Sequence, residues 1–154
     1  MNKIAILLDN VSPKHINKII FDATNNIYKT DKNSSINFFV KDINWPYRDI
    51  HYGIFKLLDY QNFEGPTLAT NLELLEFVKE TPNNNKVSLY LHSFPWADTR
   101  QIPIKNVLSL LTDSNINVYC RVGYISELFL RFNRTPKVLP FEDIVRGILY
   151  GEAV

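Results

Sequence analysis

The sequence predicts an α/β fold, namely a single Rossmann-like domain with three αβα layers and a mostly parallel sheet over residues 1–154. Apolar runs typical of buried strands alternate with segments of helical periodicity, which favours successive βαβ units. The length of 154 residues fits one domain, since one domain takes roughly 100–200 residues. No linker-like stretch or internal repeat divides the chain.

The first half of the chain predicts two strands, with a helix after each. A continuous apolar run at Lys3–Leu8 is typical of a strand buried on both faces. Ser12, followed by proline, predicts the N-cap of a helix, and a second strand is expected at Ser35–Ile43. The segment Asp49–Tyr60 is ambiguous, because its apolar spacing suits a helix while Ile54–Phe55 suits the start of a short strand. The helix is preferred.

From Gly65 onward the alternation is regular. Strands are expected at Pro66–Thr70, Lys86–His92, Val118–Val122 and Lys137–Leu139, and helices at Leu72–Lys79, Pro103–Leu111, Ser126–Asn133 and Phe141–Tyr150. Asn71 and Ser126 are predicted to cap the helices that they open.

Composition excludes several classes of protein. Seventeen Lys and Arg residues against sixteen Asp and Glu residues give a net charge of +1, which argues against a nucleic-acid partner. No apolar run approaches the roughly 20 residues of a membrane span. Cys120 is the one cysteine, so no internal disulfide is expected and a reducing, cytoplasmic location is predicted, in the host cytoplasm if a phage encodes the chain. No metal or other cofactor is expected, since no cluster has metal-ligand spacing.

The loop after the first strand holds the first candidate ligand residues. In an open α/β sheet, ligands bind beyond the carboxyl ends of the strands, where Asp9, Asn10 and Ser12 stand. This loop contains no glycine, and no dinucleotide fingerprint or P-loop occurs in the sequence, which argues against a phosphate-cradling loop. Ser12 and the following helix start can still hold an anion, although capping alone also explains a serine there.

The segment after the strand at Lys86–His92 is the richest in chemistry. His92 would act as a general base near neutral pH, Trp96 would stack on a sugar ring and Asp98 would accept hydroxyl protons, with Arg100 as a further ligand-binding residue. Structural roles remain open: His92 as a strand cap, Trp96 as loop packing, and Asp98 paired with Arg100.

The order of elements from Gly65 onward resembles the amino-terminal domain of GT-B-type glycosyltransferases of bacteriophage kind. The resemblance is carried by Gly65–Asn71 with its helix, the strand Lys86–His92 with the Trp-and-acid segment, Asn115–Val122, Tyr124 with the helix Ser126–Asn133, and Val138–Asp143. In that family the carboxy-terminal domain mainly holds the nucleotide-sugar donor, and the amino-terminal domain receives the acceptor.

The resemblance implies that this chain keeps the acceptor-side half, because Val154 stands where a second domain would begin. The expectation is a stand-alone, non-catalytic binding or interaction module, with a sugar or nucleotide-sugar ligand and either a second copy or another protein as partner. One alternative is a transferase whose donor site comes from a second copy or a partner chain, with His92, Trp96 and Asp98 facing the acceptor. The other is a structural or regulatory scaffold.

Overall fold

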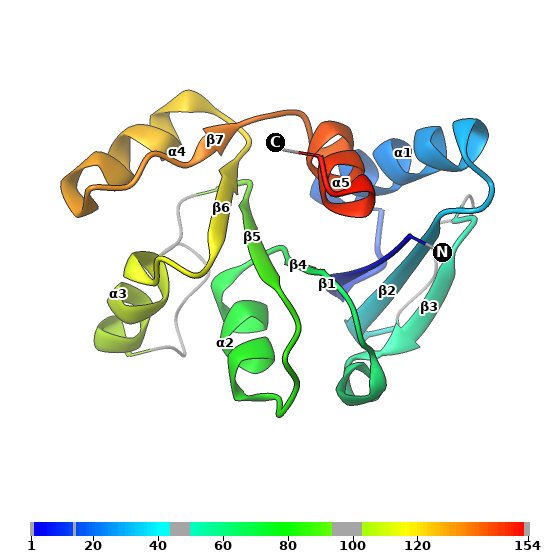
Figure 1. Cartoon of the computed structure of the whole chain (residues 1–154), viewed down its shortest axis with the longest axis horizontal. Coiled ribbons are helices and arrows are strands. Elements are labelled where there is room, and N and C mark those ends of the chain that lie inside the picture. The colour runs from blue at the N-terminus through cyan, green and yellow to red at the C-terminus, as the bar shows by residue number, and fades with distance from the viewer. Residues whose placement is uncertain (1, 14, 44–49, 94–102, 153–154) are drawn as a thin grey trace.

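In the residues that the structure describes, seven parallel strands form one sheet in the order β3-β2-β1-β4-β5-β6-β7 (Figure 1). The computed structural model describes residues 2–13, 15–43, 50–93 and 103–152. The strands are β1 (Lys3–Asn10), β2 (Ser35–Asp42), β3 (Gly53–Lys56), β4 (Thr67–Ala69), β5 (Val87–Leu91), β6 (Asn117–Cys120) and β7 (Lys137–Val138). The helices are α1 (His15–Thr30), α2 (Leu72–Glu80), α3 (Ile104–Thr112), α4 (Gly123–Leu128) and α5 (Phe141–Tyr150), with 3-10 turns η1 (Leu57–Asn62) and η2 (Phe129–Phe132).

β1 is the strand around which the chain order reverses. Ile6 stands in register with Phe38 of β2 on one side and with Leu68 of β4 on the other. Its apolar residues are at most 1% exposed, as the continuous run at the start of the sequence predicts. In doubly wound sheets such a reversal opens a crevice at the carboxyl ends of the two strands that part there.

Two apolar layers cover the sheet, which confirms the predicted αβα arrangement. α1 and α5 pack on one face, where Ile20, Phe21 and Ile144 are fully buried. α2, α3 and α4 supply the buried residues of the other face. Figure 1 shows α1 and α5 side by side on one side of the sheet, with α2 and α3 on the other.

The preferred helix at Asp49–Tyr60 is wrong. Residues Gly53–Lys56 form the edge strand β3, and the helical part is the short turn η1. Every residue of β3 stands in parallel register with a residue of β2. Phe55 also stacks on Phe39, with ring centroids 5.5 Å apart. Pairing with a neighbouring strand overrides the helical spacing of the apolar residues.

The helix expected at Ser126–Asn133 begins three residues earlier and is shorter. α4 starts at Gly123 and gives way to η2 at Phe129. Ser126 is therefore not a cap, and its hydroxyl donates to the carbonyl of Pro136 at 2.8 Å. This bond ties α4 to the segment that leads into β7.

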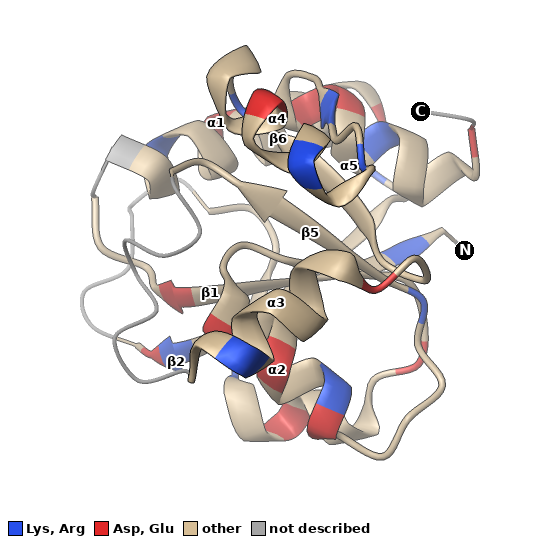
Figure 2. Cartoon of the chain, turned by 90° about the vertical axis from the view of Figure 1, so that its left-hand side faces the viewer, with Lys and Arg blue, Asp and Glu red and all other residues tan. Residues whose placement is uncertain are grey.

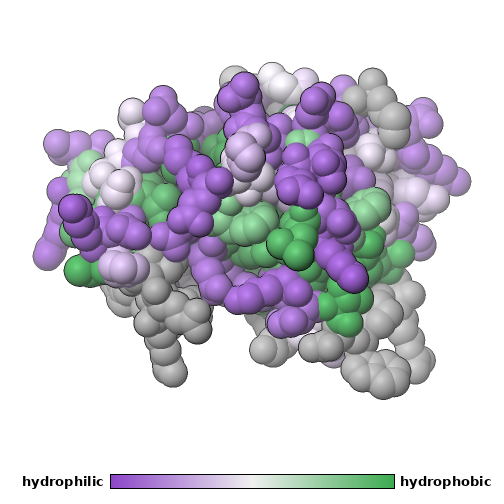
Figure 3. Space-filling view, turned by 90° about the horizontal axis from the view of Figure 1, so that it is seen from below, coloured by the Kyte–Doolittle hydropathy of each residue, from purple (hydrophilic) through white to green (hydrophobic). Residues whose placement is uncertain are grey.

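Apolar side chains also reach the surface. Figure 3 shows green patches between hydrophilic residues on the side of the molecule that includes α2. The exposed large apolar residues include Phe55, Leu58, Ile104, Tyr124, Leu130 and Val138. They belong to several different elements, and scattered exposure of this kind is ordinary for a folded chain. Among the described helices, none combines the length and apolar character that a membrane span requires.

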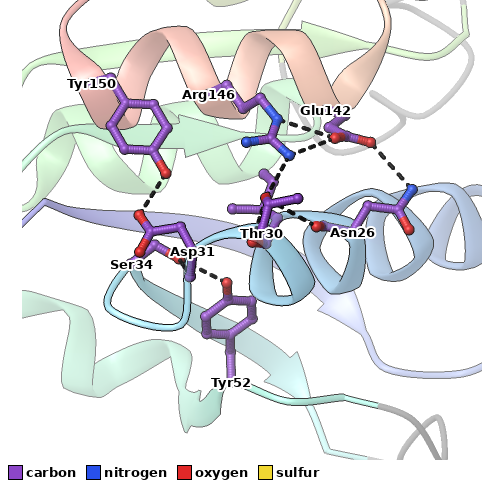
Figure 4. A network of polar contacts seen from close by, with 9 residues as sticks. Asn26, Thr30, Asp31, Ser34, Tyr52, Glu142, Arg146 and Tyr150 are labelled. Carbon is purple, nitrogen blue, oxygen red and sulfur yellow. Dashed lines mark hydrogen bonds and ion pairs between the residues drawn. The ribbon is translucent and has the colours of Figure 1, made fainter.

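A polar seam joins α5 to the end of α1 (Figure 4). The Tyr150 hydroxyl donates to Asp31 Oδ2 at 2.7 Å, and Arg146 donates both to Glu142 Oε1 at 2.9 Å and to Thr30 Oγ1 at 3.0 Å. The bond from Tyr150 holds the pKa of Asp31 below its usual range, and the Asp31 carboxylate raises the pKa of Tyr150 to about 12.

We expect Tyr150→Phe to destabilise the protein most between the ordinary pKa of Asp, 3.8, and that of Tyr, 10.0. The contribution of Asp31 is present above its ordinary pKa and is lost as the pH falls through the lowered folded value. The contribution of Tyr150 is present below pH 10.0 and is lost as the pH rises towards about 12. Denaturant unfolding of both proteins across this range measures the difference. Tyr124→Phe is the control, and a difference independent of pH would contradict the assignment.

Candidate functional site

The carboxyl ends of β1, β2 and β4 bring polar residues together where the chain order reverses. β1 ends with Asp9 and Asn10, β2 ends with Asp42, and β4 is followed directly by Thr70 and Asn71. Figure 2 shows the arrowheads of β1 and β2 side by side, with acidic and basic segments at their tips. We call this region the switch-point site, and it contains the predicted ligand residues Asp9, Asn10 and Ser12.

The glycine-free loop after β1 is held by side-chain hydrogen bonds. Asn10 Oδ1 accepts from the backbone N–H of Ser12 at 3.1 Å, from its hydroxyl at 2.6 Å and from Asn17 Nδ2 at 3.0 Å. Asn17 also donates to the Ser12 carbonyl at 2.8 Å and is only 6% exposed. The described part of α1 begins at His15, and the Ser12 hydroxyl donates to Asn10 Oδ1, so the capping role of Ser12 stays a prediction.

Asn71 joins β1 to α2. Its Oδ1 accepts from the backbone N–H of Leu74 at 2.8 Å, which confirms the predicted N-cap, and its Nδ2 donates to Asp9 Oδ2 at 2.8 Å. Thr70 reaches back across the same junction, because its hydroxyl donates to the carbonyl of Leu7 at 2.8 Å. One amide therefore fixes the start of a helix and orients an exposed carboxylate.

Among the described residues, acidic groups predominate at the switch-point site. Lys41, near the end of β2, contacts Glu73 in the first turn of α2, with Nζ and Oε1 2.6 Å apart. The hydrogen bond to Glu73 raises the pKa of Lys41, and the charges of Asp9 and Asp42 act in the same direction. Among the described residues named here, three carboxylates thus surround one ammonium group.

The remaining predicted site residues fall into two groups. His92 follows β5 at the same edge, with β4 between its strand and β1, and it is half-buried. Trp96, Asp98 and Arg100 lie outside the described residues. The roles of all the predicted site residues remain predictions.

Neither metal ligation nor thiol chemistry finds support in the described part of the chain. No group of three or more His, Cys, Asp or Glu side chains is placed to hold a metal ion within it. Cys120 is fully buried in β6 on the α2 side of the sheet, and burial raises the pKa of its thiol to about 12. A thiol in that environment is a packing group.

Comparison with models of known protein families finds no match, and searches of curated proteins and of solved structures find no significant match either.

Sequence reasoning missed the residues that build the switch-point site around Asp9. Asn17 lies within an apolar helical pattern. A polar residue at a core-facing position of a helix is itself a signal of a specific hydrogen-bonding role. Lys41 and Glu73 are 32 positions apart in sequence and meet only because β2, β1 and β4 are neighbours in the sheet. Without the strand order, neither could be assigned to the site.

We expect Asn71→Ala to lower the free energy of unfolding by about 1 kcal/mol, since it removes an N-cap side chain. The loss of the bond to Asp9 adds to this effect. Asn106→Ala is the matched control, because it removes an exposed amide bond of 3.1 Å to Glu76 between two helices, and we expect it to change stability by less than about 0.5 kcal/mol. Urea denaturation measures both, and equal effects would contradict the capping role.

We expect the Cys120 thiol to resist modification by a water-soluble thiol reagent in the folded protein. Its burial and raised pKa leave almost no accessible thiolate near neutral pH. Absorbance of the released chromophore, recorded with and without denaturant, measures the difference. Reaction at the rate of a free thiol without denaturant would show that β6 is accessible and would contradict the described packing.

Proposed function

We propose that this chain is a Rossmann-like binding module of the cytoplasm that takes a neutral sugar or sugar-bearing ligand at the switch-point site. The role corresponds to that of the acceptor-side domain in GT-B-type glycosyltransferases. In this proposal the chain binds its ligand without transferring a group. Transfer would need a donor site that a second copy or a partner chain contributes.

The observation that carries the proposal is the chemistry gathered at the switch-point site. Carboxylates accept hydrogen bonds from hydroxyl groups, and an amide both donates and accepts, so Asp9, Glu73 and Asn71 suit a ligand rich in hydroxyls. The excess of carboxylates over Lys41 disfavours a diphosphate, since like charges repel at this range. A neutral sugar therefore fits the described residues better than the diphosphate of a nucleotide sugar.

The rigidity of the loop also supports binding. Asn17 bonds to the backbone and side chain of Asn10 at the end of β1, and Asn71 fixes the start of α2. Groups that are already held in place lose little conformational freedom when a ligand arrives. The site thus has the preorganisation that weak hydroxyl contacts need in order to give useful affinity.

The test is a ¹H–¹⁵N NMR titration with glucose, maltose, UDP and UDP-glucose. We expect the sugars to shift the amide signals of Asp9, Asn10 and Asn71. Asp9→Asn preserves the shape of the side chain but removes its charge, and we expect it to weaken sugar binding by about ten-fold or more, as for a lost hydrogen bond to a charged group. Asp22→Asn, at an exposed position of α1, is the matched control.

The outcomes separate the alternatives. Shifts caused by UDP and not by the sugars would overturn the proposed ligand class. Turnover of UDP-glucose by the chain alone would overturn the non-catalytic assignment. The absence of any shift at the switch-point site, with a folded spectrum, would favour a scaffold and contradict the proposal.

A further inference from the structure

A groove lies at the amino edge of the sheet, opposite the switch-point site. Two pockets of about 300 Å³ and about 530 Å³ adjoin there, and Asn117 and Tyr119 of β6 line both. Pockets for small molecules start at roughly 300 Å³. In Figure 2 the arrowheads of β1 and β2 point to the left, and α5 lies towards the right-hand side, above the sheet. We call the two pockets together the amino-edge groove.

The walls of the amino-edge groove come from the sheet and from α5. Lys86 and Ser88 line it from the start of β5, and Gly147 and Ile148 line it from the last turns of α5. Gly147 is buried and carries no side chain, so α5 presents its bare backbone at this point. A glycine within a helix lowers the stability of the helix by about 1 kcal/mol relative to alanine. The glycine at position 147 therefore has a role other than stabilising α5.

Two hydroxyl groups of the amino-edge groove, those of Ser88 and Tyr119, are not among the buried polar atoms of the described residues that lack a hydrogen-bond partner. Ser88 is 4% exposed and Tyr119 is 5% exposed, and both line the smaller pocket. The hydroxyls of these two pocket-lining side chains are therefore available to a molecule in the groove.

Burial also raises the pKa of Tyr119, so its hydroxyl keeps its proton and can donate. The groove therefore offers a donor beside a serine that can either donate or accept.

The charges around the amino-edge groove are mainly positive. Among the described lining residues, Lys86, Lys137 and Arg134 face one carboxylate, that of Glu152. The Arg134 guanidinium donates to three backbone carbonyls, those of Leu111, Asp113 and Ile116. Those acceptors are neutral, so the guanidinium keeps its full positive charge while its position is fixed.

We propose that the amino-edge groove binds a small hydroxylated anion of the size of a sugar monophosphate. The Tyr119 and Ser88 hydroxyls contact the hydroxyl groups of the ligand, and Lys86 and Lys137 attract its phosphate. This site is independent of the switch-point site, since its residues, its edge of the sheet and the sign of its charge all differ.

The test is an NMR titration of the full chain with glucose 6-phosphate, and with glucose and inorganic phosphate as separate arms. We expect glucose 6-phosphate to shift the amide signals of Ser88, Asn117 and Tyr119. Tyr119→Phe removes one hydroxyl, and we expect it to weaken binding by about two- to twelve-fold, as for a neutral hydrogen bond. Tyr90→Phe is the matched control, because Tyr90 lies opposite Tyr119 in register, is 1% exposed and does not line the groove.

A second variant tests the charge. Lys86→Gln combined with Lys137→Gln changes exposed side chains, so the fold is retained, and we expect it to weaken glucose 6-phosphate binding and to reduce its salt dependence. Inorganic phosphate that binds as tightly as glucose 6-phosphate, with no effect of Tyr119→Phe, would overturn the role of the hydroxyls. Glucose that binds as tightly as glucose 6-phosphate would overturn the role of the charge. No shift at these amides in a folded protein would overturn the site. The two proposals are tested on the signals of different amides. A negative result at the amino-edge groove therefore does not contradict the proposal for the switch-point site.

Discussion

The burial of β1 on both faces and along both edges is the constraint on which the rest of the structure depends. Its apolar residues exclude water only if β2 and β4 take the two edges and helices take both faces. The positions of β2 and β4 on either side of β1 make the chain order reverse at β1. Asp9 and Asn10 reach the carboxyl edge of the sheet at the point of reversal because they directly follow this buried run, so the site is a consequence of packing the strand.

The two edges of the sheet differ in how their polar groups are used. At the carboxyl edge, most hydrogen bonds of the asparagine side chains at positions 10, 17 and 71 are made to each other, to Asp9 or to the backbone. The carboxylates face outward. At the amino edge, the Ser88 and Tyr119 side chains line a pocket, and their hydroxyls are not among the buried, unpaired polar atoms of the described residues. The first edge is preorganised by its own contacts, whereas the second leaves its hydroxyls available to a molecule in the groove.

The sequence allowed the fold class and most elements to be predicted, because buried strands and the cap at Asn71 have local signatures. α5 has the predicted bounds, since the apolar residues of Phe141–Tyr150 have helical spacing and prolines and glycines flank the segment. The helix was preferred to the strand at β3 because the pairing with β2 that decides between them is a tertiary contact. The partners of Asp9 and the amino-edge groove could not be predicted either, since both depend on the strand order, and Trp96, Asp98 and Arg100 lie outside the described residues.

The position of α5 has a consequence for how the chain acquires its structure during synthesis. α5 packs on α1 and β1, so the earliest and latest described elements share one apolar layer. While the ribosome is still making the middle of the chain, Ile20 and Phe21 of α1 have no second helix to cover their face. The domain therefore cannot complete its folding from the amino terminus onward, and its nascent form exposes an apolar surface until Phe141–Tyr150 emerges.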